Sequence, residues 1–138
     1  IGSMKLLVAG GRDYNREQHA FTILDLIHVF GNLGPVSLVI HGASKGADAL
    51  AAQWAEKRGI EQAALPADWE AYGKFAGPRR NGEMLAMKPD LAITFAGGRG
   101  TADVRYKLTA AGFLVKTSDE ILLEWSDSSG VFKKGGVA

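Results

Sequence analysis

The chain has 138 residues, a formal net charge of +1 and no cysteine. Without cysteine it has no disulfide, no thiolate nucleophile and no Cys-ligated zinc or iron–sulfur cluster, and a near-neutral charge gives no argument for duplex DNA binding. Glycine supplies 18 residues, roughly twice the usual share, yet no Gly-X-Y period runs through the chain. Collagen and low-complexity linkers are therefore excluded, and the glycines must occupy particular positions.

The length suits a single domain, which we expect over residues 4–125. Residues 1–3, Ile-Gly-Ser before a methionine, look like a cloning remnant, and residues 126–138 are polar and glycine-rich, which predicts a flexible tail. No apolar run approaches the ~20 residues that cross a bilayer, and no signal peptide is recognisable. We therefore expect a cytoplasmic protein without a membrane partner.

The first half of the chain alternates strand-like and helix-like patterns. Residues 5–9 form a short apolar run stopped by two glycines, which suits a buried strand. Asn15 and Gln18 have the spacing of a capping box, so we expect a helix from there to the glycines in 31–34. Residues 36–40 predict the second strand. The next helix is expected where apolar residues recur at helical spacing, at Ala47, Leu50, Ala51, Trp54 and Ala55.

The second half continues this alternation. The predicted elements are strands at residues 60–65, 91–95 and 113–115, helices at 78–87 and 101–111, and a last short helix capped by Thr117 and Glu120. Strands that alternate with helices predict right-handed βαβ units. The expected fold class is therefore α/β: a three-layer, Rossmann-like sandwich with about five parallel strands and helices on both faces of the sheet.

Three of the strand-to-helix junctions combine glycine with a cation. Because parallel strands end at the same edge of a sheet, these junctions should meet there. Glycine lets a ligand approach the backbone closely, and free N–H groups at a helix start attract an anion such as phosphate. The predicted phosphate- or nucleotide-binding residues are Gly10, Gly11 and Arg12 in the first junction, Gly42, Ala43, Ser44, Lys45 and Gly46 in the second, and Gly97, Gly98, Arg99, Gly100 and Thr101 in the third.

These features also have a purely structural interpretation. A Gly-Gly pair after a strand is most often a tight turn, Thr101 can cap its helix, and Asp48 can complement a helix dipole. The convergence of three such junctions favours the ligand site. Neither the P-loop pattern nor Gly-x-Gly-x-x-Gly is present, which disfavours an ATPase or a standard NAD dehydrogenase, and no cofactor is expected. The histidines lack metal-ligand spacing, so no metal is expected and His41 is only a weak candidate.

The segment 67–84 brings aromatic and basic residues together. One interpretation is a surface loop in which Trp69 packs against near neighbours, as loop aromatics usually do. The other has Trp69 stacking on a base or ring, with Arg80 and Asn81 at a helix start reaching the ligand. Both interpretations stay open at this point.

Taken in order, these motifs resemble the SLOG superfamily, in its YpsA-related branch. The matching stretches are GGRDY at 10–14, HGASKGADALAAQWA at 41–55, PADW at 66–69, GPRRNGEM at 77–84 and FAGGRGTADV at 95–104. The resemblance implies a Rossmann-like fold that binds nucleotides or nucleotide-derived small molecules at its glycine loops. The superfamily includes LOG-type phosphoribohydrolases, which cleave nucleoside 5′-monophosphates, and a DNA-processing protein that binds single-stranded DNA. Relatives often pair as dimers, so the resemblance allows a homodimer.

One departure from the family pattern bears on catalysis. LOG-type hydrolases carry P-G-G-x-G-T-x-x-E, whose glutamate acts together with an arginine. Here Ala96 stands at the proline position and Val104 at the glutamate position, and the nearest acid, Asp103, is rotated by about 100° on the helix. Arg80 is the counterpart of the arginine. The catalytic candidates are therefore Arg80, Asp48 and Asp103.

Three functions are open on the sequence alone. The favoured one is a sensory or processing module that binds a nucleotide or an ADP-ribose-like ligand. The second is a nucleotide N-glycosidase in which Asp48 or Asp103 replaces the glutamate, and this requires one of those carboxylates to face the glycine-loop cavity. The third is single-stranded nucleic-acid binding, which the lack of a basic run disfavours.

Overall fold

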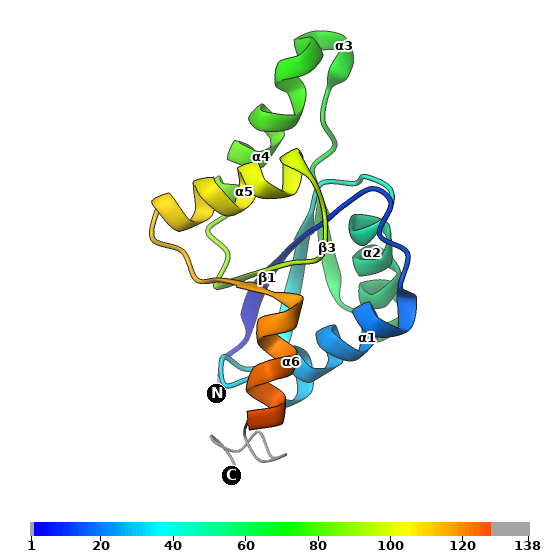
Figure 1. Ribbon diagram of the computed structural model, residues 1–138, viewed down its shortest axis with the longest axis vertical. Helices are drawn as coiled ribbons and strands as arrows, with labels where there is room; N and C mark the ends of the chain where they lie inside the picture. Colours follow the sequence, from blue (N-terminus) through cyan, green and yellow to red (C-terminus); the bar gives the residue numbers. More distant parts are fainter. Residues whose placement is uncertain (1, 128–138) are drawn as a thin grey trace.

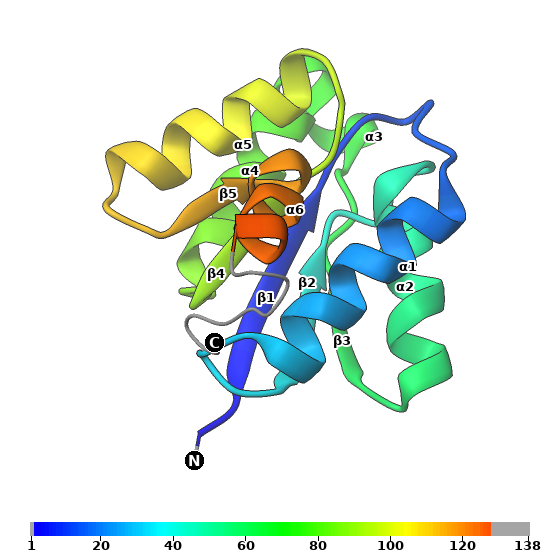
Figure 2. The same ribbon diagram turned by 60° about the horizontal axis from the view of Figure 1, so that its bottom comes forward.

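The computed structural model describes residues 2–127 and contains a five-stranded parallel sheet with the strand order β3-β2-β1-β4-β5 (Figures 1 and 2). The strands are β1 (Met4–Ala9), β2 (Val36–His41), β3 (Glu61–Ala64), β4 (Leu91–Thr94) and β5 (Val115–Thr117). The chain first builds outward from β1 to β3 and then returns to place β4 on the other side of β1. The strand order therefore reverses between β1 and β4, which is where open α/β sheets bind their ligands.

Helices cover both faces of the sheet (Figure 2). One face carries α1 (Glu17–Asp25) with the π-helical turn Leu26–Phe30, α2 (Ala47–Arg58) and α6 (Ser118–Asp127); the other carries α4 (Ala76–Ala86) and α5 (Arg99–Ala110). Alternate residues of β1 serve the two cores: Leu6 and Val8 pack with Trp54 of α2, whereas Leu7 packs with Leu108 of α5. The three-layer, Rossmann-like α/β fold is confirmed.

Between β3 and α4 the chain makes two short turns, α3 (Trp69–Tyr72) and a 3-10 turn at Gly73–Phe75. These turns and the start of α4 stand above the carboxyl edge of the sheet (Figure 1). Asp68 caps α3, because its side-chain oxygen accepts a hydrogen bond from the Ala71 N–H at 3.0 Å. The segment thus brings Trp69 to the same edge of the sheet as the glycine-rich junctions.

The predicted helix caps had different outcomes. The capping box at Asn15 was wrong: α1 begins at Glu17, whose N–H donates to the Asn15 backbone carbonyl at 3.1 Å, and no side chain caps the helix. The box at Thr117 and Glu120 is confirmed, since the Glu120 N–H donates to Thr117 Oγ1 at 3.1 Å and the Thr117 N–H donates to Glu120 Oε1 at 2.8 Å.

Helix α6 continues through Asp127, two residues beyond the expected end of the domain at 125. The rest of the predicted tail, residues 128–138, lies outside the described residues, as does residue 1. Within residues 2–127, every helix is too short or too polar to traverse a lipid bilayer.

Candidate functional site

The three glycine-rich junctions follow β2, β1 and β4, which are adjacent in the sheet, and they meet at its carboxyl edge. Backbone hydrogen bonds join them: the Gly11 N–H donates to the Ala96 carbonyl at 2.8 Å, and the Ala47 N–H donates to the Gly11 carbonyl at 3.2 Å. Together with α4 they enclose a cavity of about 250 Å³, the central cavity. Its walls include ten predicted binding residues: Gly10, Gly11, Arg12, Ser44, Arg80, Asn81, Gly98, Arg99, Gly100 and Thr101.

The other predicted binding residues lie around this cavity. Gly42, Ala43, Lys45 and Trp69 line a shallow extension of about 220 Å³ beside the second junction. Trp69 also borders a larger cavity of about 870 Å³, the Trp69 cavity, whose walls include Arg12, Lys74, Arg99 and Asp103. Gly97 belongs to a further cavity on the α6 side. Gly46 lines none of the described cavities, because it packs against the backbone of Gly11 and Arg12.

The junction glycines serve two different purposes. Four of them are required by packing: a Cβ on Gly10 would lie 2.5 Å from the Ala47 Cβ, one on Gly11 would lie 2.8 Å from the Ala96 carbonyl oxygen, and one on Gly46 or Gly97 would also lie closer than 3.0 Å to backbone atoms. A Cβ on Gly42 would instead meet the guanidinium end of the Arg80 side chain. Gly98 and Gly100 are different, because a Cβ there meets nothing within 4 Å. Only these two leave open space at the wall of the central cavity, where a ligand would approach the backbone.

We expect Gly97→Ala to destabilise the fold. The new Cβ would collide with the Thr101 side chain and lie 2.7 Å from the Gly11 backbone nitrogen, so two adjacent loops would have to separate. Overpacking of this kind costs about 1–3 kcal/mol of unfolding free energy. Urea denaturation of the variant and the wild type measures the loss, and an unchanged midpoint would show that the junctions are loosely packed.

Asp48 organises the second junction. Its side chain is 6% exposed, and its Oδ2 accepts hydrogen bonds from the Gly42 N–H at 3.1 Å and the Ser44 N–H at 3.2 Å. His41 contributes from the end of β2: its Nδ1 accepts from the Ala43 N–H at 3.0 Å and its Nε2 pairs with Gln62 Oε1 at 2.9 Å. Both ring nitrogens of His41 are therefore occupied, and this histidine shapes the loop.

Asp48 and Arg80 face each other at the wall of the central cavity. Burial raises the pKa of Asp48, although the hydrogen bonds from the loop and the nearby His41 and Arg80 oppose the shift. Burial likewise lowers the pKa of Arg80, against the attraction of Asp48. The Arg80 guanidinium donates to the Gly42 carbonyl and, through Nε, to Asn81 Oδ1 at 3.0 Å. The site thus holds a buried carboxyl beside a positioned cation.

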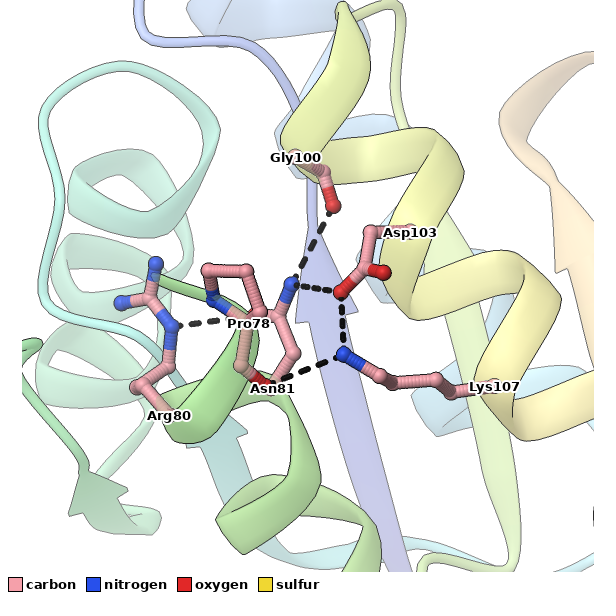
Figure 3. Close-up of polar contacts among 6 residues, drawn as sticks. All are labelled: Pro78, Arg80, Asn81, Gly100, Asp103 and Lys107. Carbon is pink, nitrogen blue, oxygen red and sulfur yellow. Dashed lines mark hydrogen bonds and ion pairs between the residues drawn. The ribbon is translucent and has the colours of Figure 1, made fainter. Parts of the chain in front are cut away.

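Asn81 and Asp103 connect α4 to α5 (Figure 3). The Asn81 side-chain amide donates to the Gly100 carbonyl at 3.3 Å and to Asp103 Oδ2 at 3.0 Å, so both of its donor hydrogens are used. Lys107 Nζ forms an ion pair with the same Asp103 oxygen at 2.7 Å. Although partial burial opposes them, the hydrogen bonds from Lys107 and Asn81 lower the pKa of Asp103. Asp103 is consequently held as a carboxylate in a structural network.

Free cations and an aromatic face surround the central cavity. Arg12, Lys45 and Arg99 are exposed, and none of the ion pairs within residues 2–127 includes them. The guanidinium of Arg12 lies over the Trp69 ring at 5.7 Å from its centroid, and Trp69 is 49% exposed. About half of the Trp69 surface is therefore accessible, and the residue lines the Trp69 cavity together with Arg12 and Arg99.

A further cavity of about 700 Å³, the Tyr14 cavity, lies between α1, α5 and the start of α6. Its walls include Tyr14, His19, Phe95, Arg105 and Ser118, none of which the sequence predicted as site residues. The only available signal was that Tyr14 and Phe95 flank the glycines of the first and third junctions.

Comparison with known proteins adds the family. Residues 4–72 match the family described as YspA, cpYpsA-related SLOG. The Gene 61 protein of Mycobacterium phage D29 is 32% identical over 119 residues, which cover 80% of this chain and 93% of that protein. The chain belongs to the cpYpsA-related SLOG family. This confirms the resemblance drawn from the motifs, and at a coarse level it supports nucleotide-related binding or processing.

The family match extends over the first two junctions and Trp69, whereas Arg80 and the third junction lie beyond residue 72. A solved structure, that of glycinamide ribonucleotide transformylase 1 from Symbiobacterium toebii, is similar with a TM-score of 0.49 and 22% identity. The match covers 83% of this SLOG chain and 50% of that chain, so this chain spans half the length of that protein.

Proposed function

We propose that this SLOG protein binds a nucleotide or nucleotide-derived small molecule with a phosphate group in the central cavity. The observation that carries the proposal is the open space at Gly98 and Gly100, at the start of α5. No side chain caps α5, so its first N–H groups are available to an anion, and the helix dipole favours negative charge there. Arg12 and Arg99 supply cations at the same wall.

The base is assigned to the Trp69 cavity. A base that stacks on the half-exposed Trp69 indole would take the place of the Arg12 guanidinium, which lies over the ring and also lines the central cavity. One residue therefore borders both the phosphate position and the base position. Planar heteroaromatic rings stack on tryptophan without needing a specific hydrogen-bond pattern.

Trp69→Ala should weaken binding of AMP and leave binding of ribose 5-phosphate unchanged. Loss of one base–aromatic stack costs about 1–3 kcal/mol, so at least a fivefold rise in the Kd of AMP is expected. The control is Phe75→Ala, which removes a 66% exposed aromatic outside the described cavities. Isothermal titration with both ligands measures the difference. Equal weakening of AMP and ribose 5-phosphate would contradict the assignment of the base.

A thermal-shift panel tests the function as a whole. Inorganic phosphate, AMP, ADP, ADP-ribose and NAD are each added in excess to the full chain, with native mass spectrometry to count bound molecules. A ligand present at 100 times its Kd stabilises the folded state by about 2.7 kcal/mol, so a clear rise in Tm is expected for at least one nucleotide. A chain whose Tm responds to none of them, and which carries none in the mass spectrum, would refute nucleotide binding.

Nucleotide N-glycosidase activity is the second candidate, and Asp48 is the observation that favours it. Its buried carboxyl lines the central cavity beside Arg80, and Val104, which stands at the glutamate position of the LOG-type pattern, lines the same cavity. Water would add to C1′ of AMP as the N-glycosidic bond breaks, and the base would leave with a proton to give adenine and ribose 5-phosphate. Incubation with AMP followed by chromatography for free adenine tests this activity.

A further inference from the structure

We propose that the Tyr14 cavity binds a cyclic group on the far side of the ligand's phosphates from the nucleoside, which we call the second ring. The molecule bound by this chain would then carry a nucleoside and the second ring, joined by a phosphate bridge across Gly98. This inference rests on the proposed function, from which it takes the phosphate in the central cavity and the base beside Trp69. The chemical class is that of ADP-ribose and related pyrophosphate-bridged nucleotides, as distinct from mononucleotides.

The three cavities follow one another along the carboxyl edge of the sheet. The central cavity shares Arg12 and Arg99 with the Trp69 cavity, and it shares Gly98 and Thr101 with the Tyr14 cavity. The central cavity, of about 250 Å³, is thus flanked by the Trp69 cavity of about 870 Å³ and the Tyr14 cavity of about 700 Å³. A mononucleotide with its base beside Trp69 would fill the first two cavities and leave the third empty.

Gly98 makes a crossing between the cavities feasible. It lies on the wall shared by the central and Tyr14 cavities, and a Cβ there would stand in open space. Any side chain at this position would project into the route between them. The glycine therefore keeps open the path that a phosphate bridge would take.

Aromatic side chains form part of the wall of the Tyr14 cavity. Tyr14 and Phe95 are nearly fully buried and pack with ring centroids 5.0 Å apart, and His19 meets Phe95 edge-on at 6.2 Å. Tyr14 and Phe95 therefore form the buried floor of the cavity, and a sugar or heteroaromatic ring would reach the accessible rings of half-buried His19 and of Tyr106. Tyr106, 73% exposed on α5, stands at the wall nearer to solvent.

Hydrogen-bonding groups complete the cavity. Arg105 uses Nη1 to donate to Thr94 Oγ1 at 3.1 Å and forms no ion pair within the described part of the chain, so its other nitrogens are available. His19 pairs through Nδ1 with the Tyr14 hydroxyl, and its Nε2 has no hydrogen bond among residues 2–127. The Ser118 hydroxyl lies at the same wall. These groups suit the hydroxyls of a pentose, such as the distal ribose of ADP-ribose.

The test compares ADP with ADP-ribose by isothermal titration. ADP-ribose contains the whole of ADP and adds the second ring as an ester of the terminal phosphate, which also removes one negative charge, so the effect of the ring is read from the comparison between variants. We expect wild type to bind ADP-ribose at least about tenfold more tightly than ADP. Ala102→Phe, at an exposed α5 position that lines the Tyr14 cavity, should abolish this difference and leave the Kd of ADP within about twofold of wild type. Ala110→Phe, exposed on the same helix and outside the described cavities, should preserve it.

Other outcomes would overturn the inference in distinguishable ways. If ADP binds and ADP-ribose binds no more tightly, the second ring has no site, while the proposed function stands. If Ala102→Phe weakens ADP and ADP-ribose equally, the base rather than a second ring occupies the Tyr14 cavity. If neither ligand binds to wild type, the proposed function fails and the second-ring site fails with it.

Discussion

Gly98→Val should reduce nucleotide affinity by about a hundredfold or more and leave the free energy of unfolding within about 0.5 kcal/mol of wild type. A Cβ at this exposed position meets nothing within 4 Å, so we expect the isopropyl group to fit without moving the fold. The same group would occupy the space over the start of α5 where the phosphate is proposed to bind. Titration with AMP and urea denaturation, performed on the same preparation, measure the two effects.

Two other glycines make this experiment decisive. Gly82→Val on α4 inserts the same group where a Cβ also meets nothing within 4 Å, but away from the described cavities, so affinity and stability should both stay near wild type. Gly97→Ala should differ from Gly98→Val by lowering the free energy of unfolding, because its cost lies in loop packing. If Gly98→Val retains wild-type affinity, the third junction is only a turn and the phosphate binds elsewhere.

Much of the fold follows from local sequence patterns. The apolar runs of β1 and β4 and the helical stripe of α2 indicate their elements without tertiary information, and their alternation gives the parallel sheet. β5 was expected at 113–115 and lies at Val115–Thr117, where it pairs with Ala92–Thr94 of β4. This short edge strand is positioned by its distant partner, and local hydrophobicity carries no information about that pairing.

The site was less accessible to sequence reasoning, for a physical reason. The seven junction glycines look alike in the sequence. Only the packing around each distinguishes Gly98 and Gly100, which leave open space, from the five at which a Cβ would collide with a neighbouring residue. The Tyr14 cavity draws its walls from segments near residues 14, 95, 105 and 118, which no motif spacing connects. From the sequence alone, Asp48 and Asp103 were both candidates for the catalytic acid. The structure distinguishes them, because Asp103 forms an ion pair with Lys107.

That difference between the two acids gives opposite pH dependences of stability. Burial raises the pKa of Asp48, so the folded protein holds this proton more tightly than the unfolded chain does. The free energy of unfolding therefore falls as pH rises from the unfolded value near 3.8 through the higher folded value, and the contribution is constant above that window. Asp103, despite partial burial, has a pKa lowered by Lys107 and Asn81, so it stabilises the fold above the unfolded value and loses this as pH falls.

Asp48→Asn should accordingly remove the falling component of stability in the acid range, as measured by urea denaturation at a series of pH values. The amide oxygen can still accept the hydrogen bonds of Gly42 and Ser44, so the second junction should persist. Removal of a negative charge from the wall of the central cavity should also tighten AMP binding, by about 1 kcal/mol or fivefold. Any release of adenine should drop to background, because a neutral amide cannot exchange a proton with the leaving base.

Asp103→Asn is the matched control, and its effect on stability should be the opposite. It should lower stability at neutral pH, because Lys107 loses its partner, and it should tighten AMP binding less than Asp48→Asn does, because the charge it removes is already paired with Lys107. Equal pH profiles for wild type and Asp48→Asn would contradict the burial-driven pKa shift. If wild type releases adenine from AMP, and Asp48→Asn binds AMP more tightly but releases none, Asp48 is the acid of an N-glycosidase. If Asp48→Asn binds AMP more tightly and wild type itself releases no adenine, this SLOG site is a binding module.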